Sequence, residues 1–378
     1  MMQDSVKNNF IKRWWRVIDQ QTIIAMIILV SFSLMLVTTA SPAVANRIGL
    51  TDNYFSSRHI IFLFLAAIIV LVFSSLDKKW IRRFAILGFL ASLIMLVFVK
   101  LYGFEVKGAT RWINIAGFSY QPSEFMKPFF AVVTGWVLSI QYQEEFPSFK
   151  ACFCLFVLVV ILLIIQPDFG MIVMVSAVFG IQLFVAGLPI IWIFIAVFGA
   201  VSGSIGAYLL LPHVAARINK FLDPLNSENY QITKSLEAFE SGGLYGKGPG
   251  EGVVKQYLPD SHTDFIFAVA GEEFGAIICL MIVLAFAYIV IRNLVNLLHE
   301  NDKFTQIAAI GIISQFGLQA VINIGVTLNL LPTKGMTLPF ISYGGSSTLA
   351  VSIGMGMLLA LTKRKTSLVK YRSQNVEV

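Results

Sequence analysis

The residue best placed for acid–base chemistry is Asp264, which ends the polar stretch Tyr257–Asp264 and is followed at once by Phe265, Ile266 and Phe267. A carboxylate at such a boundary between polar and apolar sequence can be partly desolvated, and desolvation makes a carboxylate a stronger general base. The same position also suits the N-cap of a helix, so a structural role is the alternative. Asp264 is therefore the first candidate for a catalytic residue.

Two features near Asp264 limit what this region can do. His262 has no partner at a metal-ligand spacing, so the sequence does not indicate a zinc site. Glu272 and Glu273 lie about two helical turns further along, inside the next apolar run. Two adjacent acids in such a run must be paired with other groups or face a cavity.

A second segment, Lys107–Lys127, combines basic residues with a helix start. Pro122 suits the first position of a helix, and Glu124 in the first turn favours the helix dipole. Glu124 and Lys127 are three residues apart, so they share one helix face and can form an ion pair. Arg111 and Lys127 would line an anion-binding site; a capped helix start with a salt bridge is the alternative.

Two more segments interrupt the apolar runs. Asp168 lies in Gln166–Gly170, a bent turn at the membrane edge, where an ionisable group has a function or a partner, or caps the next helix. The stretch Ser241–Gly252 is rich in glycine but is not a phosphate-binding loop, because Lys247 is followed by Gly248. It predicts a flexible backbone able to approach a large ligand closely.

The fourth polar segment is Leu331–Ser347, which contains two prolines, three glycines and five Ser or Thr hydroxyls. This composition does not form a plain transmembrane helix. Irregular backbone at membrane depth is tolerated only where it is buried in protein or lines a cavity. The segment is therefore expected to do one or the other at the outer edge of the membrane.

The elements that position these segments follow from the composition. The chain has 378 residues, of which 57% are apolar and only 13% charged, whereas a soluble domain carries about 25% charge. A water-soluble globule of this size cannot bury so much apolar surface. The composition also fits poorly with a disordered chain, a disulfide scaffold or a nucleic-acid-binding domain, and the three cysteines are interpreted as apolar packing residues.

Ten apolar runs are long enough to cross a bilayer. They start near residues 22, 59, 84, 122, 151, 171, 189, 265, 304 and 343. The first, Thr22–Ala40, has 19 residues, which is longer than the apolar core of a signal peptide at about 7–15, so it is interpreted as a span. We expect an all-α integral membrane protein with about ten transmembrane helices and two long outer connections. The larger connection, at about 211–264, joins helices 7 and 8.

Charge distribution gives the orientation. Sixteen of the 28 basic residues lie in the short segments on one side of the predicted spans, and this side is cytoplasmic by the positive-inside rule. Both termini are then cytoplasmic, and the net charge of +7 reflects topology and does not predict a nucleic-acid partner. The expected divisions are a cytoplasmic segment at 1–21, a polytopic membrane domain at 22–365 and a cytoplasmic tail at 366–378.

The polar segments together resemble the SEDS family (shape, elongation, division and sporulation) of bacterial peptidoglycan polymerases. The resemblance covers about Thr22–Lys365. It rests on five motifs in order: Gly108-x-x-Arg-Trp-Ile, Gln121-Pro-Ser-Glu-x-x-Lys127, Gln166-Pro-Asp-x-Gly170, Leu258-Pro-Asp-Ser-His-Thr-Asp264 and Leu338-Pro-Phe-Ile-Ser-Tyr-Gly-Gly-Ser-Ser347. Pro332–Gly335 and Gly248–Gly252 resemble the cell-division members more than the elongation members.

This resemblance implies a glycosyltransferase that polymerises lipid II, a disaccharide-pentapeptide on undecaprenyl diphosphate, at the outer face of the bacterial inner membrane. It implies that Asp264 is the essential residue and that the protein acts at the division septum. It also implies partners: a class B penicillin-binding protein, which is a transpeptidase, and other division proteins. A lipid II flippase, an elongation-type polymerase and an inactive division scaffold are the alternatives.

A mechanism follows on physical grounds. Asp264 as the single general base gives inversion at the anomeric carbon, and the leaving diphosphate needs no acid. It does need positive charge, supplied by basic side chains or by a divalent cation such as Mg or Mn, and the sequence indicates no other cofactor. The expected substrate-binding residues are Arg111, Lys127, Arg217, Glu124, Asp168, Ser342 and Ser346.

Overall fold

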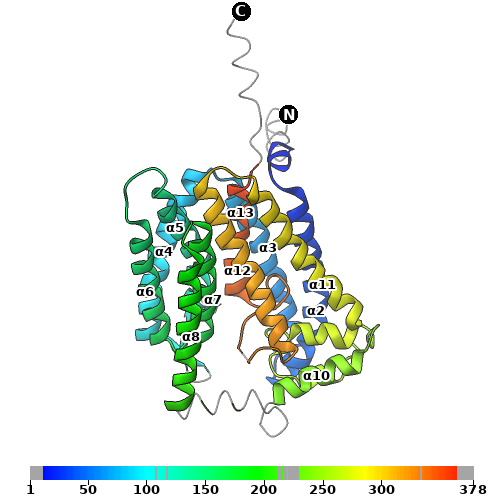
Figure 1. Cartoon of the computed structure of the whole chain (residues 1–378). Helices are drawn as coiled ribbons and strands as arrows, with labels where there is room; N and C mark the ends of the chain where they lie inside the picture. Colours follow the sequence, from blue (N-terminus) through cyan, green and yellow to red (C-terminus); the bar gives the residue numbers. More distant parts are fainter. Residues whose placement is uncertain are drawn as a thin grey trace, which may run out of the picture.

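The structure is a bundle of membrane-length helices that stand side by side (Figure 1). This computed structural model describes residues 12–106, 109–115, 118–210, 215, 219, 230–332 and 334–363. Within them, the end of α13 (Gly345–Leu361) lies at the same end of the bundle as the start of α2 (Gln20–Arg47). The helix α10 (Tyr230–Gly242) lies at the opposite end.

Each of the ten predicted apolar runs forms one helix. They are α2, α3 (Tyr54–Ser75), α4 (Lys78–Tyr102), α5 (Pro122–Ile140), α6 (Ser148–Ile165), α7 (Phe169–Val185), α8 (Ile190–Leu210), α11 (Ile266–Leu298), α12 (Lys303–Thr327) and α13. The prediction of an all-α membrane protein is confirmed, with a small sheet in addition.

Length and composition alone qualify six of these helices to cross a membrane: α2, α3, α4, α6, α11 and α12. The apolar helices α7 and α13 are shorter, at 17 residues each, which is at the lower end of what a span needs, about 17–25 residues. The helix α5 has 19 residues but carries Glu124 and Lys127 near its start. The chain is therefore a multi-pass membrane protein in which α5 and α13 are largely buried inside the bundle.

Close helix packing explains why α5 and α13 are buried. In a bilayer, helices associate through small residues that let backbones approach, because lipid is as apolar as a leucine side chain. A Cβ added at Gly135 of α5 would lie 2.6 Å from the Ala308 Cα of α12, and one at Gly356 of α13 would lie 3.3 Å from the Val70 Cα of α3. These glycines therefore set the spacing of the central helices.

The connection between α4 and α5, expected as a loop, contains a three-stranded antiparallel sheet in the order β1-β2-β3. The strands are β1 (Phe104–Val106), β2 (Ala109–Ile115) and β3 (Phe118–Tyr120). The long strand β2 pairs with both neighbours, for example Asn114 with Ser119. The sheet positions Arg111 beside the turn before α7.

The N-terminal part of α11 is separated from the rest of the helix by a break at Gly275, where φ is 77° and ψ is 179°. A break in a buried helix leaves backbone groups without their helical partners. The glycine-rich stretch supplies them: the N–H groups of Lys247 and Gly248 donate to the carbonyls of Glu272 and Glu273 at 3.0 and 2.9 Å. In the structure this stretch thus approaches α11, and its approach to a large ligand stays a prediction.

Both acids at the break are paired. Glu272 accepts hydrogen bonds from the backbone N–H groups of Val254 and Lys255, at 2.7 and 2.9 Å. The Lys255 ammonium forms an ion pair with Glu273 and donates to the carbonyl of Thr39 on α2 at 3.0 Å. Lys255 and Glu273 are both buried. The pair therefore ties the 3-10 turn at Val254–Gln256 to two helices.

Replacing Lys255 with methionine is expected to destabilise the protein strongly. Breaking a buried ion pair by removing one partner costs about 3–5 kcal/mol, because the other charge stays buried. We expect Lys255→Met to lower the midpoint of thermal unfolding in detergent. The double variant Lys255→Met/Glu273→Met should recover most of the loss.

The control is Lys234→Met on α10, which removes an ion pair with Glu237 that is exposed to solvent. Exposed pairs contribute little to stability. An equal fall of the midpoint in the two single variants would contradict the account of the buried pair.

Candidate active site

Asp264 lies in the turn just before α11, at the end of the bundle where α10 lies. Its side chain is half-buried. The turn is closed locally by the carbonyl of Asp260, which accepts from the N–H groups of Thr263 and Phe265 at 3.0 and 3.2 Å. The sequence-predicted base therefore borders the apolar interior and remains accessible.

Three successive carbonyls hold this turn to the rest of the molecule. The His262 carbonyl accepts from the Tyr343 N–H at 2.9 Å. The Thr263 carbonyl accepts from the Ser342 hydroxyl at 2.5 Å. The Asp264 carbonyl accepts from the Asn323 side-chain amide at 2.8 Å. Asn323 belongs to α12, and the other two donors lie in the irregular segment between α12 and α13. The backbone of Asp264 is thus fixed from outside its own turn.

The irregular segment also approaches the carboxylate itself. A Cβ added at Gly335 would lie 2.9 Å from Oδ2 of Asp264. Contacts this short do not occur for real Cβ atoms, so any larger residue would displace the carboxylate. Glycine at position 335 lets the backbone border the candidate base.

A group of charged residues surrounds the turn before α7. Asp168 caps α7 by accepting from the Met171 N–H at 3.3 Å. Its Oδ1 also lies 3.8 Å from Arg111 Nη1 and 3.8 Å from Lys334 Nζ. Arg111 further donates to the carbonyls of Gln166 and Pro167. Asp168 thus has both the capping role and the charged partners that the sequence left open.

Lys334 is the cation in this group with unused donors. Its Nζ is buried and makes no hydrogen bond within the described residues. Burial lowers the pKa of Lys334 to about 8. Its side chain crosses over Gly170, where a Cβ would lie 1.8 Å from the lysine Cδ. A residue larger than glycine at position 170 would therefore force this lysine onto another path.

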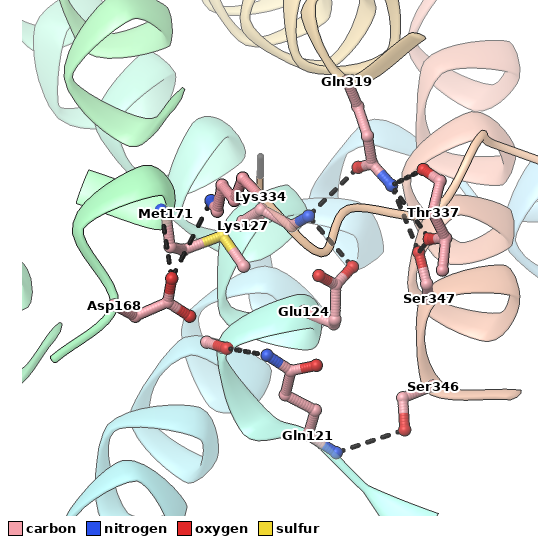
Figure 2. Close-up of polar contacts among 11 residues, drawn as sticks. Gln121, Glu124, Lys127, Asp168, Met171, Gln319, Lys334, Thr337, Ser346 and Ser347 are labelled. Carbon is pink, nitrogen blue, oxygen red and sulfur yellow. Dashed lines mark hydrogen bonds and ion pairs between the residues drawn. The ribbon is translucent and has the colours of Figure 1, made fainter. Parts of the chain in front are cut away.

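A second polar chain continues from α5 to α13 through the bundle interior (Figure 2). Lys127 Nζ lies 2.9 Å from Glu124 Oε2 and donates to Gln319 of α12 at 3.0 Å. The Gln319 amide donates in turn to the Thr337 carbonyl at 3.1 Å and to the Ser347 hydroxyl at 3.2 Å. The predicted Glu124–Lys127 ion pair is present, and it is buried.

The other predicted site residues are placed differently. The Ser342 hydroxyl is engaged twice, because it also accepts from the Leu338 N–H at 2.8 Å. The Ser346 hydroxyl donates to the Ser119 carbonyl at 3.0 Å and accepts from the Gln121 N–H at 3.1 Å. Both hydroxyls therefore fasten the irregular segment to its surroundings. Arg217 lies outside the described residues.

His262 packs against two aromatic rings that also contact each other. Its ring centroid lies 4.3 Å from that of Phe55 and 5.3 Å from that of Tyr343. Burial lowers the pKa of His262 to about 4. The imidazole is therefore neutral near pH 7 and packs as an aromatic side chain beside the turn of Asp264.

Sequence reasoning did not single out Lys334, Gln319 or Asn323. The last two are polar residues in an apolar helix, and with Gln315 they recur every four residues along α12. This spacing places them on one helix face. All three are buried. The signal in the sequence was this row of polar residues on one face of an otherwise apolar helix.

Comparison with known proteins gives consistent results. The family model of the FtsW/RodA/SpoVE cell cycle proteins matches residues 19–367. A Caulobacter vibrioides protein named probable peptidoglycan glycosyltransferase FtsW is 43% identical over 357 residues, covering 93% of this chain and 91% of the relative. A protein of the same name from Pseudoalteromonas translucida is 34% identical, covering 92% of each chain.

Two solved structures share the fold. A chain of a peptidoglycan synthase complex that coordinates polymerization and crosslinking has a TM-score of 0.78 at 24% identity, covering 92% of this chain and 98% of that one. The rod shape determining protein RodA of Thermus thermophilus has a TM-score of 0.69 at 24% identity, covering 92% and 97%. At these identities the likeness bears on the fold alone.

Proposed function

The chain belongs to the FtsW/RodA/SpoVE family of cell cycle proteins, and from this premise we propose that it is a peptidoglycan glycosyltransferase. Its substrate is lipid II, which it polymerises into glycan strands at the outer face of the bacterial inner membrane. The names of its relatives support this activity and its use in cell division. Asp264 acts as the general base.

One observation carries the proposal: the adjacent residues Lys334 and Gly335 border two different acids. Lys334 Nζ lies 3.8 Å from Asp168, and Gly335 borders the carboxylate of Asp264. The candidate base thus lies beside Gly335, and the adjacent residue in the chain, Lys334, belongs to a group of three cations with Arg111 and Lys127. A sugar hydroxyl at the base and a diphosphate at the cations would fit this juxtaposition.

The reaction proceeds by direct displacement. Asp264 removes the proton from the acceptor 4-hydroxyl as its oxygen attacks the anomeric carbon of the donor. The bond from that carbon to the undecaprenyl diphosphate breaks, and the diphosphate leaves with the bonding electrons. One displacement inverts the anomeric centre, so an α-linked donor gives a β-linked glycan. The cations stabilise the charge that develops on the leaving group.

Glu124 and Asp168 have a supporting part in this proposal. Each lies within 4 Å of a cation, Glu124 near Lys127 and Asp168 near Arg111 and Lys334. Buried cations without counter-ions would lose their protons or move toward water. The two carboxylates keep the cations in place before the substrate binds.

A divalent cation is a separate part of the proposal. Among the described residues, no three or more His, Cys, Asp or Glu side chains are grouped closely enough to hold a metal ion. A Mg or Mn ion would therefore take most of its ligands from the substrate diphosphate.

The orientation and partners also belong to the proposal. The end of α13 lies opposite to α10 in the bundle (Figure 1), and just after it Lys363 donates to the Ser75 carbonyl at the end of α3. Lys78 and Arg82 follow at the start of α4. These basic residues support cytoplasmic termini and an outer active site. A class B penicillin-binding protein would cross-link the glycan, in agreement with the synthase complex that shares the fold. Other division proteins would bring the pair to the septum.

The test is glycan synthesis by the purified full chain, with and without its transpeptidase partner, from labelled lipid II in detergent. We expect Asp264→Asn to abolish polymer formation, a loss of at least about 100-fold for removal of a general base, and to retain the thermal stability of the parent. The matched control is Asp260→Asn, four residues earlier in the same turn, which should stay active.

Polymer formation in detergent also distinguishes a polymerase from a flippase, because detergent leaves no membrane for lipid II to cross. A parent protein that makes no glycan under any of these conditions would contradict the polymerase proposal. So would an Asp264→Asn variant that polymerises at the parent rate.

The lowered pKa of Lys334 predicts a pH dependence of substrate binding. Its pKa of about 8 means that the ammonium is charged at pH 7 and neutral at pH 9. A neutral amine binds a diphosphate more weakly, so we expect the KM for lipid II to rise between pH 7 and pH 9. Lys334→Arg should remove this rise, because arginine stays charged. An unchanged rise in Lys334→Arg would assign it to another group.

A further inference from the structure

We propose that Asn323 of α12 is a positioning residue for the reaction: its side-chain amide fixes the backbone of the base Asp264 and the backbone that borders the base. This inference rests on the proposed function and deepens it. It assigns to one buried amide a role that neither its residue type nor its apolar helix indicates.

The amide spans two chain segments. Asn323 Nδ2 donates to the carbonyl of Asp264 at 2.8 Å and to the carbonyl of Met336 at 2.6 Å. A primary amide has two N–H donors, and both are used here. The orientation of the amide is fixed by its partners, because the reversed orientation would place its oxygen against two carbonyl oxygens. The side chain is 1% exposed, so water does not replace these contacts.

The two carbonyls lie on either side of the active carboxylate. One belongs to Asp264 itself. The other belongs to Met336, which follows Gly335, and the Gly335 backbone approaches Oδ2 of Asp264. The rigid side-chain amide of Asn323 therefore positions both the base and the backbone that borders it. Without the amide, Ser342 and the Tyr343 N–H still hold the two preceding carbonyls, so the turn can persist while the carboxylate shifts.

Displacement of a catalytic group by about 1 Å can cost about 100-fold in rate. Because Asn323 does not touch the substrate in this account, its loss should lower kcat and leave the KM for lipid II nearly unchanged. A merely structural role predicts something else: fewer active molecules in proportion to lost stability, whichever buried amide is removed.

The chain provides a matched control in Asn293 of α11. Asn293 is also buried, at 0% exposure, and its Nδ2 also donates twice, to Thr22 at 2.9 Å and to the Ile289 carbonyl at 2.8 Å. It lies in the part of α11 far along the helix from Asp264. Removing either amide leaves a similar cavity, but only Asn323 contacts the base.

The experiment compares Asn323→Ala, Asn323→Ser and Asn293→Ala in the full chain with its partner, by glycan synthesis over a range of lipid II concentrations. Thermal unfolding and active-enzyme content are measured on the same samples. We expect Asn323→Ala to lower kcat about 100-fold with a KM within about threefold of the parent. Asn323→Ser keeps one donor and should retain more activity than the alanine variant, and it serves if Asn323→Ala does not fold. Asn293→Ala should keep the parent kcat.

A parent-like kcat in Asn323→Ala, a loss confined to KM, or an equal loss of kcat in Asn293→Ala would each overturn the inference. These outcomes are distinct from failure of the proposed function. If the proposed function is wrong, the parent itself makes no glycan, or Asp264→Asn is as active as the parent. The role of Asn323 would then be wrong as well.

Discussion

Backbone that is not helical can be buried at membrane depth only if its N–H and C=O groups find partners inside the protein. The segment between α12 and α13 meets this constraint through side chains of α12 and through its own turns. Asn323 binds the Met336 carbonyl, Gln319 binds the Thr337 carbonyl, and Ser342 accepts from the Leu338 N–H. The same segment then holds the turn of Asp264 and carries Lys334 to Asp168. The candidate site therefore depends on the hydrogen bonds that make this irregular backbone tolerable.

The break in α11 shows the same constraint at a second place. Gly275 ends the helical hydrogen bonding, and the glycine-rich stretch supplies the missing donors at Glu272 and Glu273. A Cβ at Gly246 would lie 2.2 Å from the Glu273 carbonyl oxygen, so the stretch can pair only because it lacks side chains there. The buried Lys255–Glu273 ion pair adds a side-chain link to α2. The short N-terminal part of α11, which begins beside Asp264, is thereby hydrogen-bonded to the glycine-rich stretch across the break.

Periodicity and hydropathy predict most of the fold, because a span is a local property of about 20 residues. All ten runs form helices, and the Glu124–Lys127 pair follows from i, i+3 geometry. The site is only partly predictable. Asp264 was identified because it stands at a polar–apolar boundary, and its role remains a prediction. Asn323 and Lys334 were missed because their importance comes from residues 59 and 166 positions away in the chain. Ser342 was expected to bind substrate, but its hydroxyl is engaged with the backbone of Thr263 and Leu338.

The irregular segment between α12 and α13 holds the turn of the base through hydrogen bonds. Four of its amides, those of Leu338, Ile341, Ser342 and Tyr343, donate hydrogen bonds within the described structure. Hydrogen–deuterium exchange of the full chain in lipid nanodiscs, followed by mass spectrometry, measures their protection directly. We expect the four hydrogen-bonded amides in peptides covering 338–343 to exchange as slowly as those of α12. Exchange of these peptides at the rate of an unstructured loop, with α12 still protected, would contradict this expectation.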